Sequence, residues 1–384
     1  MKGNKALWLT IGVIVVAIIA IVAVQQTRQP KEEKVIKIGA ILPLTGDISE
    51  YGQRVKRGID IAVEEINKSP GGLRVQVKYE DSEGVPQKGV NAAQKLINTE
   101  GVRYIIGAVS SSVTLSIVPI TTRAKVLLMS PASSSPKLSG ISPFFVRNWP
   151  SDVLEATVLA EYAFDKLSVR RVIILYTNND YGLGLQQEFV KSFKRRGGSI
   201  VAVEGYPLNA RDFKGIIAKY GQSFKDVDAI YLAGYHRDMA IATKQLREAG
   251  YSRLILGDAD YGIPELIQIA GRAAEGAIYA TPWYDPESNE TSKRFVEVFK
   301  QRYATVPSEF EANGYDAVRL IVSGIQQRGD DPAAVAQFIR ELKEYPGAGG
   351  RLTFTQAGDV IKPIAIMRVE NGTFQRIEVF EHEE

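Results

Sequence analysis

The chain has 384 residues, 45% of them hydrophobic, and its 47 basic and 44 acidic side chains give a net charge of +3. Its length is enough for two medium-sized domains, and so small a net charge argues against nucleic-acid binding. The absence of cysteine excludes disulfides, thiolate metal sites and cysteine nucleophiles. Because His236 and His382 are the two histidines of the sequence, we expect neither a metal site nor another cofactor.

The N-terminal segment, residues 1–34, has the pattern of a membrane-targeting sequence. Lys2 and Lys5 precede an uncharged, mostly apolar run from Ala6 to Val24, and a polar linker follows at residues 25–34. The run is long enough to cross a bilayer as a helix, which takes ~20 residues. It is longer than the ~7–15 apolar residues of a secretory signal, and no clear cleavage site follows it. We therefore expect a hydrophobic helix that tethers an extracytoplasmic body to the cell membrane; a cleaved signal and a secreted or periplasmic body are the alternative.

From Val35 onward, short β-rich runs alternate with helical patterns, which is typical of βαβ units and parallel sheets. The first series predicts strands at 35–42, 71–81, 102–109 and 125–131, separated by helices at 49–68, 86–101 and 110–124. A second series predicts helices at 152–167, 183–198, 212–224 and 236–250, and strands at 170–178, 199–207, 228–234 and 253–260. Two such series indicate an α/β protein with two doubly wound, parallel-sheet lobes.

The C-terminal part of the chain has a different pattern. Helices are predicted at 292–304, 311–327 and 332–342, and a β-like end follows at 349–380. Turn signals interrupt this end at residues 357–359 and at Asn371-Gly372. The end of the chain therefore predicts hairpin strands instead of another strand-helix unit.

Two serine triplets, Ser110–Ser112 and Ser133–Ser135, each follow a predicted strand. In a parallel α/β sheet, ligands bind outside the carboxyl ends of the strands. The first triplet also opens a helix, so it combines hydroxyls, unpaired backbone N–H groups and the positive end of a helix dipole. This combination suits a carboxylate or a phosphate. The alternative is that the serines only cap the helix and form turns.

The sequence offers little support for catalysis. It contains no G-x-S-x-G elbow, no phosphate-binding P-loop, and no G-x-G-x-x-G after a strand. His236 is the plausible general base, but it belongs to the second strand series, away from the serine triplets. We therefore expect a binding protein and not an enzyme.

Aromatic and acidic residues gather at further strand ends and loops. Tyr51, Trp149, Tyr181 and Tyr235 fall there and predict the wall of a pocket with polar groups on it, with simple packing as the alternative. Asp258 and Asp260 end the strand at 253–260. In a crevice, one of them would be the natural partner of an ammonium group; the alternative is that they form a turn or cap a helix.

At this point a family resemblance becomes visible in the residues. The sequence resembles the type I periplasmic binding proteins of the leucine/isoleucine/valine-binding class, the solute receptors of amino-acid ABC importers. The resemblance covers residues 35–380. It rests on these segments: "IKIGAILPLTGDISEYGQRVKRGIDIAVEEIN", "VRYIIGAVSSSVTLSIVPI", "VLLMSPASSS", "FFVRNWPSD", "YTNNDYGLG", "IYLAGYHRDMAIATKQLREAG" and "GRLTFTQAGD…ENGTFQRI".

The resemblance implies roles for single residues. It matches Ser111 and Ser134 with residues that hold the ligand carboxylate, and Ala132 with a residue whose carbonyl accepts from the ligand ammonium. The family's ammonium-binding glutamate aligns with Ala259, between Asp258 and Asp260, so an aspartate would replace it: Asp260 first, Asp258 second. The aromatic contacts to the ligand implied by the resemblance are Tyr51, Tyr181 and Tyr235.

The resemblance also implies a domain plan and a function. The first lobe would comprise residues 35–147 and 280–347, and the second 148–279 and 348–384, joined by a hinge of three crossings. Hinge closure around a ligand is a known motion of periplasmic binding proteins. The protein would capture a small, branched-chain-like amino acid and deliver it to ABC permease subunits. The alternatives are an amide, urea or aromatic carboxylate as ligand, or a sensory ectodomain.

Overall fold

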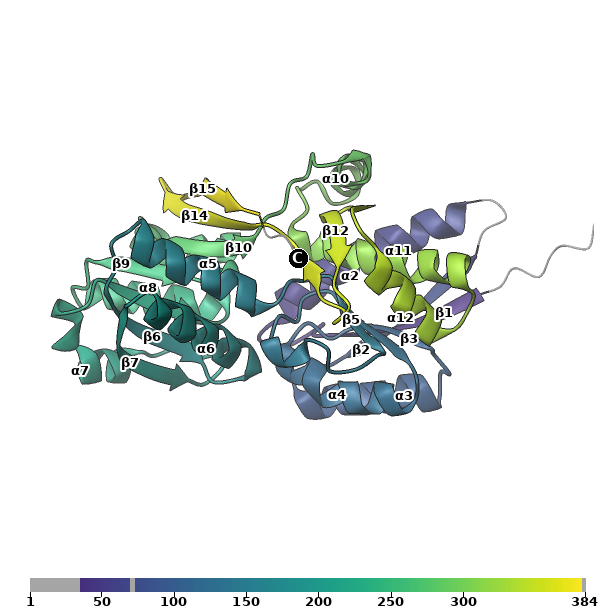
Figure 1. Cartoon of the computed structure of the whole chain (residues 1–384), viewed down its shortest axis with the longest axis horizontal. Coiled ribbons are helices and arrows are strands. Elements are labelled where there is room, and N and C mark those ends of the chain that lie inside the picture. The colour runs from purple at the N-terminus through teal and green to yellow at the C-terminus, as the bar shows by residue number, and fades with distance from the viewer. Residues whose placement is uncertain (1–34, 70–72, 382–384) are drawn as a thin grey trace, which may run out of the picture.

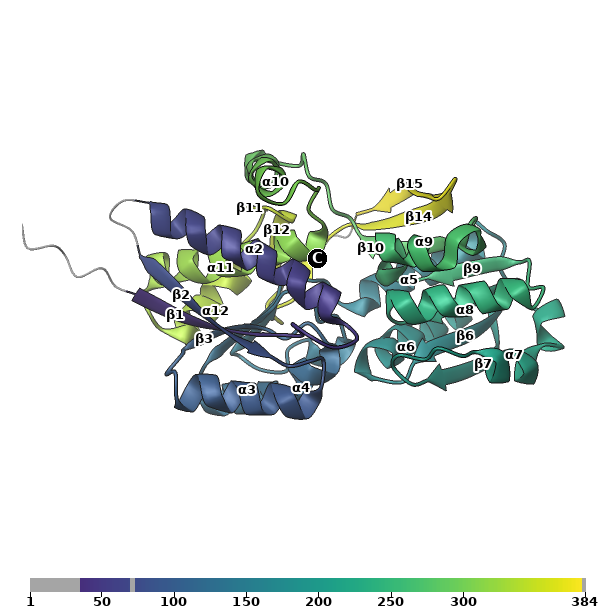
Figure 2. The same cartoon turned by 180° about the vertical axis from the view of Figure 1, so that it is seen from behind.

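The computed structural model describes residues 35–69 and 73–381. The hydrophobic helix expected at 6–24, the linker after it and His382 lie outside the described residues. Figures 1 and 2 show two lobes side by side, joined near the middle of the molecule. In the part of the chain that the structure describes, no helix has both the length and the apolar character needed to cross a membrane.

The first lobe is built on a parallel sheet with the strand order β2-β1-β3-β4-β5. These strands are β1 (Val35–Leu42), β2 (Arg74–Asp81), β3 (Tyr104–Gly107), β4 (Leu127–Ser130) and β5 (Phe145–Arg147). Helices α3 (Pro86–Asn98) and α4 (Ser111–Arg123) cover one face, while α2 (Ser49–Lys68) and α11 (Glu309–Arg328) cover the other (Figure 2). Ile105 and Ile106 pack on opposite faces, because successive side chains of a strand point to opposite sides.

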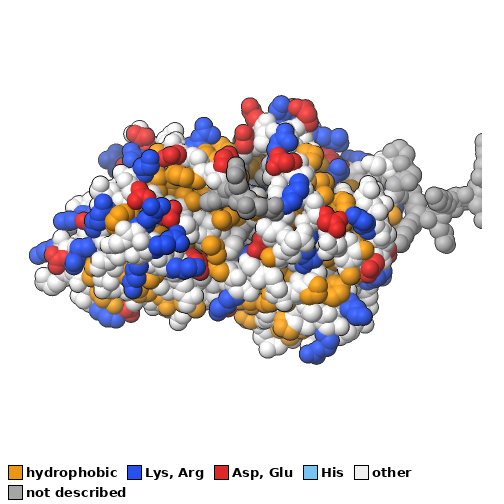
Figure 3. Space-filling view, in the orientation of Figure 1, with side chains coloured by type: hydrophobic (Ala, Val, Ile, Leu, Met, Phe, Trp, Pro, Cys, Tyr) orange, Lys and Arg blue, Asp and Glu red, His pale blue; other side chains and the backbone are white. Residues whose placement is uncertain are grey.

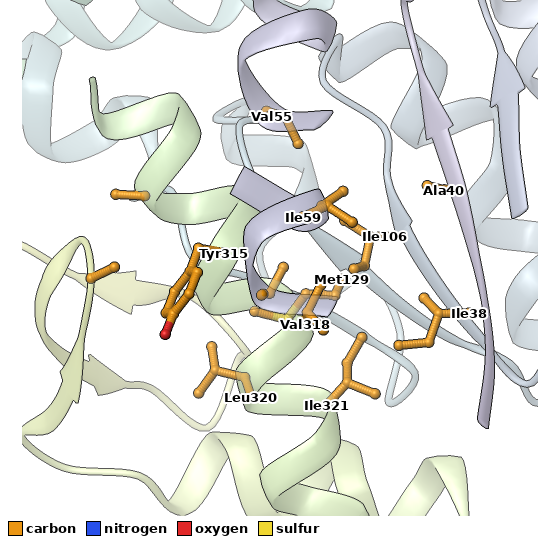
Figure 4. Close-up of a cluster of buried hydrophobic side chains, with 14 of the residues drawn as sticks. Ile38, Ala40, Val55, Ile59, Ile106, Met129, Tyr315, Val318, Leu320 and Ile321 are labelled. Carbon is orange, nitrogen blue, oxygen red and sulfur yellow. The ribbon is translucent and has the colours of Figure 1, made fainter. Parts of the chain in front are cut away.

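Helices α2 and α11 cross in direct backbone contact over the core of the first lobe. A Cβ atom on Gly58 would lie 1.8 Å from the carbonyl oxygen of Glu311, and one on Gly314 would lie 2.3 Å from that of Val55. Glycine is therefore required at both positions of this crossing. Figure 4 shows the core beneath it, with side chains from both helices meeting those of the sheet: Ile38, Ala40, Val55, Ile59, Ile106, Met129, Tyr315, Val318, Leu320 and Ile321.

The second lobe has a mixed sheet with the order β15-β14-β10-β9-β8-β6-β7, in which β6 to β10 are parallel. Its strands are β6 (Arg171–Thr177), β7 (Ser199–Tyr206), β8 (Ala229–Ala233), β9 (Leu254–Gly257), β10 (Ile278–Pro282), β14 (Ile364–Glu370) and β15 (Thr373–Phe380). Helices α5 (Asp152–Asp165) and α6 (Asp180–Arg195) cover the face seen in Figure 1. Helices α7 (Lys214–Tyr220), α8 (His236–Glu248) and α9 (Pro264–Ala270) cover the face seen in Figure 2.

The lobe boundaries near the C-terminus differ from the expected ones. Strand β10 belongs to the second sheet, so the first lobe resumes after Pro282 and not at residue 280. It then contains α10 (Glu290–Tyr303), α12 (Pro332–Glu341), β11 (Tyr345–Gly347), β12 (Gly350–Phe354) and β13 (Val360–Ile361). The assignment of 348–361 to the second lobe was wrong because Phe354 and Val360 are buried in the first-lobe core, and Asp359 pairs with Arg147 at 2.6 Å. The β14–β15 hairpin alone joins the second sheet.

The chain passes between the lobes three times, after β5, after β10 and between β13 and β14, as predicted. The β14–β15 hairpin turns at Asn371-Gly372, where both residues have positive φ angles of 53° and 69°. Short 3₁₀ turns lie in the loops: η1 (Pro136–Leu138), η2 (Ser223–Lys225), η3 (Ala259–Gly262) and η4 (Gly271–Ala274). Figure 3 shows basic and acidic side chains interspersed over one face of both lobes.

Candidate functional site

A cavity of about 30 Å³ lies between the lobes, at the carboxyl ends of strands from both sheets. The structure brings together all the predicted site residues there except Asp258. The residues that line it are Tyr51, Val109, Ser111, Ala132, Ser134, Trp149, Tyr181, Tyr235, Asp260 and Phe310. This volume is far below the ~300–1,000 Å³ of ligand pockets and corresponds to about one to three water molecules, so a larger solute enters only when the walls move further apart.

The two serine loops meet in the first lobe. The Ser111 hydroxyl accepts from the backbone N–H of Ser135 at 3.2 Å, which ties the first loop to the second. The Ser133 hydroxyl lies 3.0 Å from the carbonyl oxygens of Ala108 and Val109, to which it donates. Ser133 is therefore a structural tie, whereas Ser111 and Ser134 line the cavity.

The serine loops also present the start of a helix to the cavity. Ser111 is the first residue of α4, and the first helical hydrogen bond runs from Thr114 N–H to the Ser110 carbonyl. The N–H groups that precede Thr114 in α4 are those that a helix leaves without intrahelical partners. Together with the positive end of the helix dipole, they make this end of the cavity suitable for an anion.

The two aspartates after β9 point in different directions. Asp258 is fully buried; its Oδ2 accepts from Gly234 N–H at 2.6 Å and its Oδ1 accepts from Asp260 N–H at 3.0 Å. Asp258 thus holds the backbone of two loops. Asp260 faces the cavity, where its Oδ2 accepts from the Tyr51 hydroxyl at 2.9 Å. Of the two, Asp260 is placed to meet a ligand.

Asp260 belongs to a buried acidic cluster in the second lobe. Burial raises the pKa of Asp260 to about 8, and the nearby Asp152 adds to this rise while the Tyr51 hydrogen bond opposes it. Burial raises the pKa of Asp152 itself to about 7, and it also raises the pKa of Glu155 and of Asp258. A cation that entered the cavity would favour the ionised form of these carboxyls and so oppose the rise in their pKa.

Aromatic side chains close the rest of the cavity. The ring of Tyr235 lies 5.8 Å from that of Tyr51 and 5.4 Å from that of Tyr181, between ring centres. Phe310 lies edge-on to Tyr51 at 5.2 Å and stacks on Trp149 at 4.8 Å. Sequence reasoning missed Phe310, because it comes from the start of α11 and not from a strand end. It also missed Val109, although that residue directly precedes the first serine triplet.

Polar contacts across the mouth of the cavity hold the lobes in a closed arrangement. The Tyr51 hydroxyl lies 2.8 Å from His236 Nδ1, and Ser112 donates to Asp180 at 2.8 Å. Arg54 pairs with Glu265 at 2.7 Å. Each of these pairs joins a residue of the first lobe to one of the second, so closure and the shape of the cavity depend on each other.

Comparison with known protein families identifies the family of this chain. A model of the periplasmic binding protein family matches residues 35–373. The chain therefore belongs to this family of extracytoplasmic solute-binding proteins, which confirms the resemblance in the sequence.

Individual relatives and solved structures give the same result. Leu/Ile/Val-binding protein homolog 3 of Brucella melitensis is 31% identical over 335 residues, which are 85% of this chain and 89% of that protein. The leucine-binding protein LivK from Thermotoga maritima matches with a TM-score of 0.85 and 33% identity, over 90% of this chain and 99% of that one. LivJ from Streptococcus pneumoniae is a branched-chain amino acid transporter substrate-binding protein whose structure is in complex with isoleucine. It matches with a TM-score of 0.81 and 25% identity, over 90% of this chain and 99% of that one. These likenesses confirm the predicted two-lobed fold.

Proposed function

We propose that this protein captures a small α-amino acid with a branched apolar side chain between its lobes. One observation carries the proposal: a single small cavity has the serine-bearing start of α4 on the first lobe and the buried carboxyl of Asp260 on the second. An amino acid has complementary groups, since its carboxylate suits the helix N-terminus and its ammonium suits a carboxylate.

In this proposal different site residues bind the different groups of the ligand. Ser111 and Ser134 donate to the carboxylate, and Asp260 accepts from the ammonium together with the Ala132 carbonyl. Tyr51, Tyr181, Tyr235 and Trp149 enclose the ligand. The names of the relatives support a branched apolar side chain. An amide, a urea or an aromatic carboxylate has no ammonium and would leave Asp260 without a cationic partner.

A thermal-shift screen of the twenty amino acids tests this function. We expect leucine, isoleucine or valine to stabilise the protein, by about 2.7 kcal/mol at a ligand concentration one hundred times Kd. Leucinamide, which lacks the carboxylate, and 4-methylpentanoate, which lacks the ammonium, serve as matched controls and should stabilise far less. No stabilisation by any amino acid would reject the ligand class, and equal stabilisation by both controls would reject the assigned roles.

We further propose that the loaded, closed protein delivers its ligand to the permease subunits of an ABC importer, and that residues 6–24 tether it to the membrane. The tether is tested by the mass of the protein isolated from membranes: an intact N-terminus supports it, whereas a mature chain beginning after the apolar run supports a cleaved signal.

A sensory ectodomain is the alternative to delivery. Uptake of labelled leucine that persists in a strain lacking this protein would argue against the importer role.

A further inference from the structure

A second, larger cavity lies directly beside the proposed ligand cavity. Its volume is about 270 Å³, and residues around the hinge and on the second sheet line it. Most of its lining is aromatic or aliphatic, including Tyr279, Trp283, Tyr284, Met367 and Phe374. Tyr279 and Met367 are opposite each other in the β10–β14 pair, so their side chains share one face of the sheet.

The charged residues at this second cavity already have partners. Glu309 pairs with Lys362 at 2.8 Å, and Arg54 pairs with Glu265 at 2.7 Å. Because these charges are neutralised, the cavity suits an apolar group more than an ion.

Two stacked rings separate this cavity from the ligand cavity. Trp149 and Phe310 line both spaces. Their ring centres are 4.8 Å apart with an angle of 28° between the ring planes, and the two residues are only 5% and 8% exposed. Trp149 comes from the first crossing between the lobes and Phe310 from the start of α11, so this wall consists of side chains from two separate segments.

The ligand side chain would point at this wall. In the proposed binding mode, the carboxylate is at Ser111 and Ser134 and the ammonium is at Asp260. The three tyrosines that line the cavity each carry a hydroxyl, whereas Trp149 and Phe310 present apolar ring surface. An apolar ligand side chain that extends away from these polar groups would therefore contact the stacked pair, which limits how far it can extend.

We propose that the Trp149–Phe310 pair determines specificity by limiting the length of the ligand side chain, and that the cavity behind it is a subsite for larger apolar side chains. The occupant of that subsite would be the ring of an aromatic amino acid, held by the same serines and the same aspartate. The inference rests on the proposed function and adds to it a reason for rejecting large amino acids.

Calorimetry with L-leucine and L-phenylalanine on the full chain tests the inference. The wild type should prefer leucine. Phe310→Ala should shift the affinity ratio toward phenylalanine by about tenfold or more, the scale of discrimination by apolar pockets. Adding Met367→Trp to Phe310→Ala refills the second cavity and should cancel the shift.

Two further variants make the outcome unambiguous. Phe310→Leu keeps a buried hydrophobic residue, so it should fold even if the alanine variant does not, and it should shift the ratio in the same direction by a smaller factor. Phe338→Ala removes a half-buried ring of α12, away from both cavities, and should leave the ratio unchanged. Equal losses for both ligands in the Phe310 variants, or a shift that survives Met367→Trp, would overturn the inference. A wild type that binds no amino acid would instead overturn the proposed function.

Discussion

Ser111 combines two donors at one point, because its hydroxyl and its N–H both belong to the first turn of α4. Its hydroxyl oxygen accepts from Ser135 N–H, which leaves the hydroxyl proton for a ligand. We predict that Ser111→Ala and Ser134→Ala each weaken leucine binding by about 1.5–3 kcal/mol, the range for hydrogen bonds to charged groups. Titration calorimetry measures this. Ser116→Ala, on the same helix but outside the cavity, is the control and should bind normally.

Asp258 and Asp260 allow a paired test at the same strand end. Asp260→Asn should weaken amino-acid binding by about 1.5–3 kcal/mol through loss of the charged acceptor, while the free energy of unfolding does not fall, because the amide removes the cost of burying this carboxyl. Asp258→Ala should instead lower the free energy of unfolding by about 1–3 kcal/mol, because Gly234 N–H would lose its acceptor. Ligand titration and urea unfolding of both variants check this. The same loss of affinity with the same loss of stability in both would refute the division of roles.

At this scale the sequence predicted most of the cavity in two ways: residues just after parallel strands meet at one edge of a sheet, and the family resemblance implied the single residues Ser111, Ser134 and Ala132 within the loops. Phe310 has no such signal, because the packing of α11 over the first sheet brings it to the site. The resemblance ranked Asp260 before Asp258, but no local pattern gives the reason for that order. The order depends on the 3₁₀ turn η3, in which Asp258 caps the turn and Asp260 is left facing the cavity.

At the scale of elements, the close contact between α2 and α11 leaves no room for a side chain at Gly58. Gly58→Ala should destabilise the protein by about 1–3 kcal/mol, because the new Cβ would meet the backbone of α11, which cannot move aside as a flexible side chain would. Gly215→Ala in α7 is the matched control, since a Cβ there meets no atom of the described residues within 4 Å. It should stabilise by about 0.5–1 kcal/mol. Urea unfolding measures the free energy of unfolding of both variants. A change of the same sign in the two variants would contradict the prediction.

Element types were predictable because each lobe repeats one simple pattern of buried strands and amphipathic helices. The partner of an element was less predictable when long-range burial decided it. Strands β12 and β13 have the same β-rich composition as β14, yet Phe354 and Val360 bury against α11 and α12, whereas Ile364 and Ile366 pack in the second lobe. No local pattern distinguishes these two destinations.

At the scale of the whole molecule, the closed cleft buries titratable groups of the second lobe: Asp152, His236 and Asp260. Burial raises the pKa of Asp260 from 3.8 to about 8, so the closed, ligand-free protein holds a proton there that an open, solvated cleft would release. Closure without ligand is therefore favoured as pH falls and is lost as pH rises through 8. Asp152, with a pKa of about 7, acts in the same direction.

His236 acts in the opposite direction. Burial lowers its pKa from 6.5 to about 4, so below about pH 6.5 an open cleft gains a proton that the closed one excludes. Acid therefore opposes closure through His236 while it promotes closure through Asp260. The His236 effect cancels that of one carboxyl between about pH 4 and 6.5, so the three groups together predict that empty closure is most favourable in acid and weakens with rising pH up to about 8.

Small-angle scattering of the ligand-free protein from pH 5 to pH 9 would show this as a radius of gyration that rises with pH and levels off above about pH 8. Asp260→Asn should reduce this rise, because it removes a proton-binding group, and His236→Gln should make the rise steeper below about pH 6.5, because it removes the group that opposes the carboxyls. A saturating amino acid should hold the radius low across the range, since its ammonium replaces the proton at Asp260. A wild-type radius that does not change with pH would show that burial of these groups is not what opposes closure of the empty cleft.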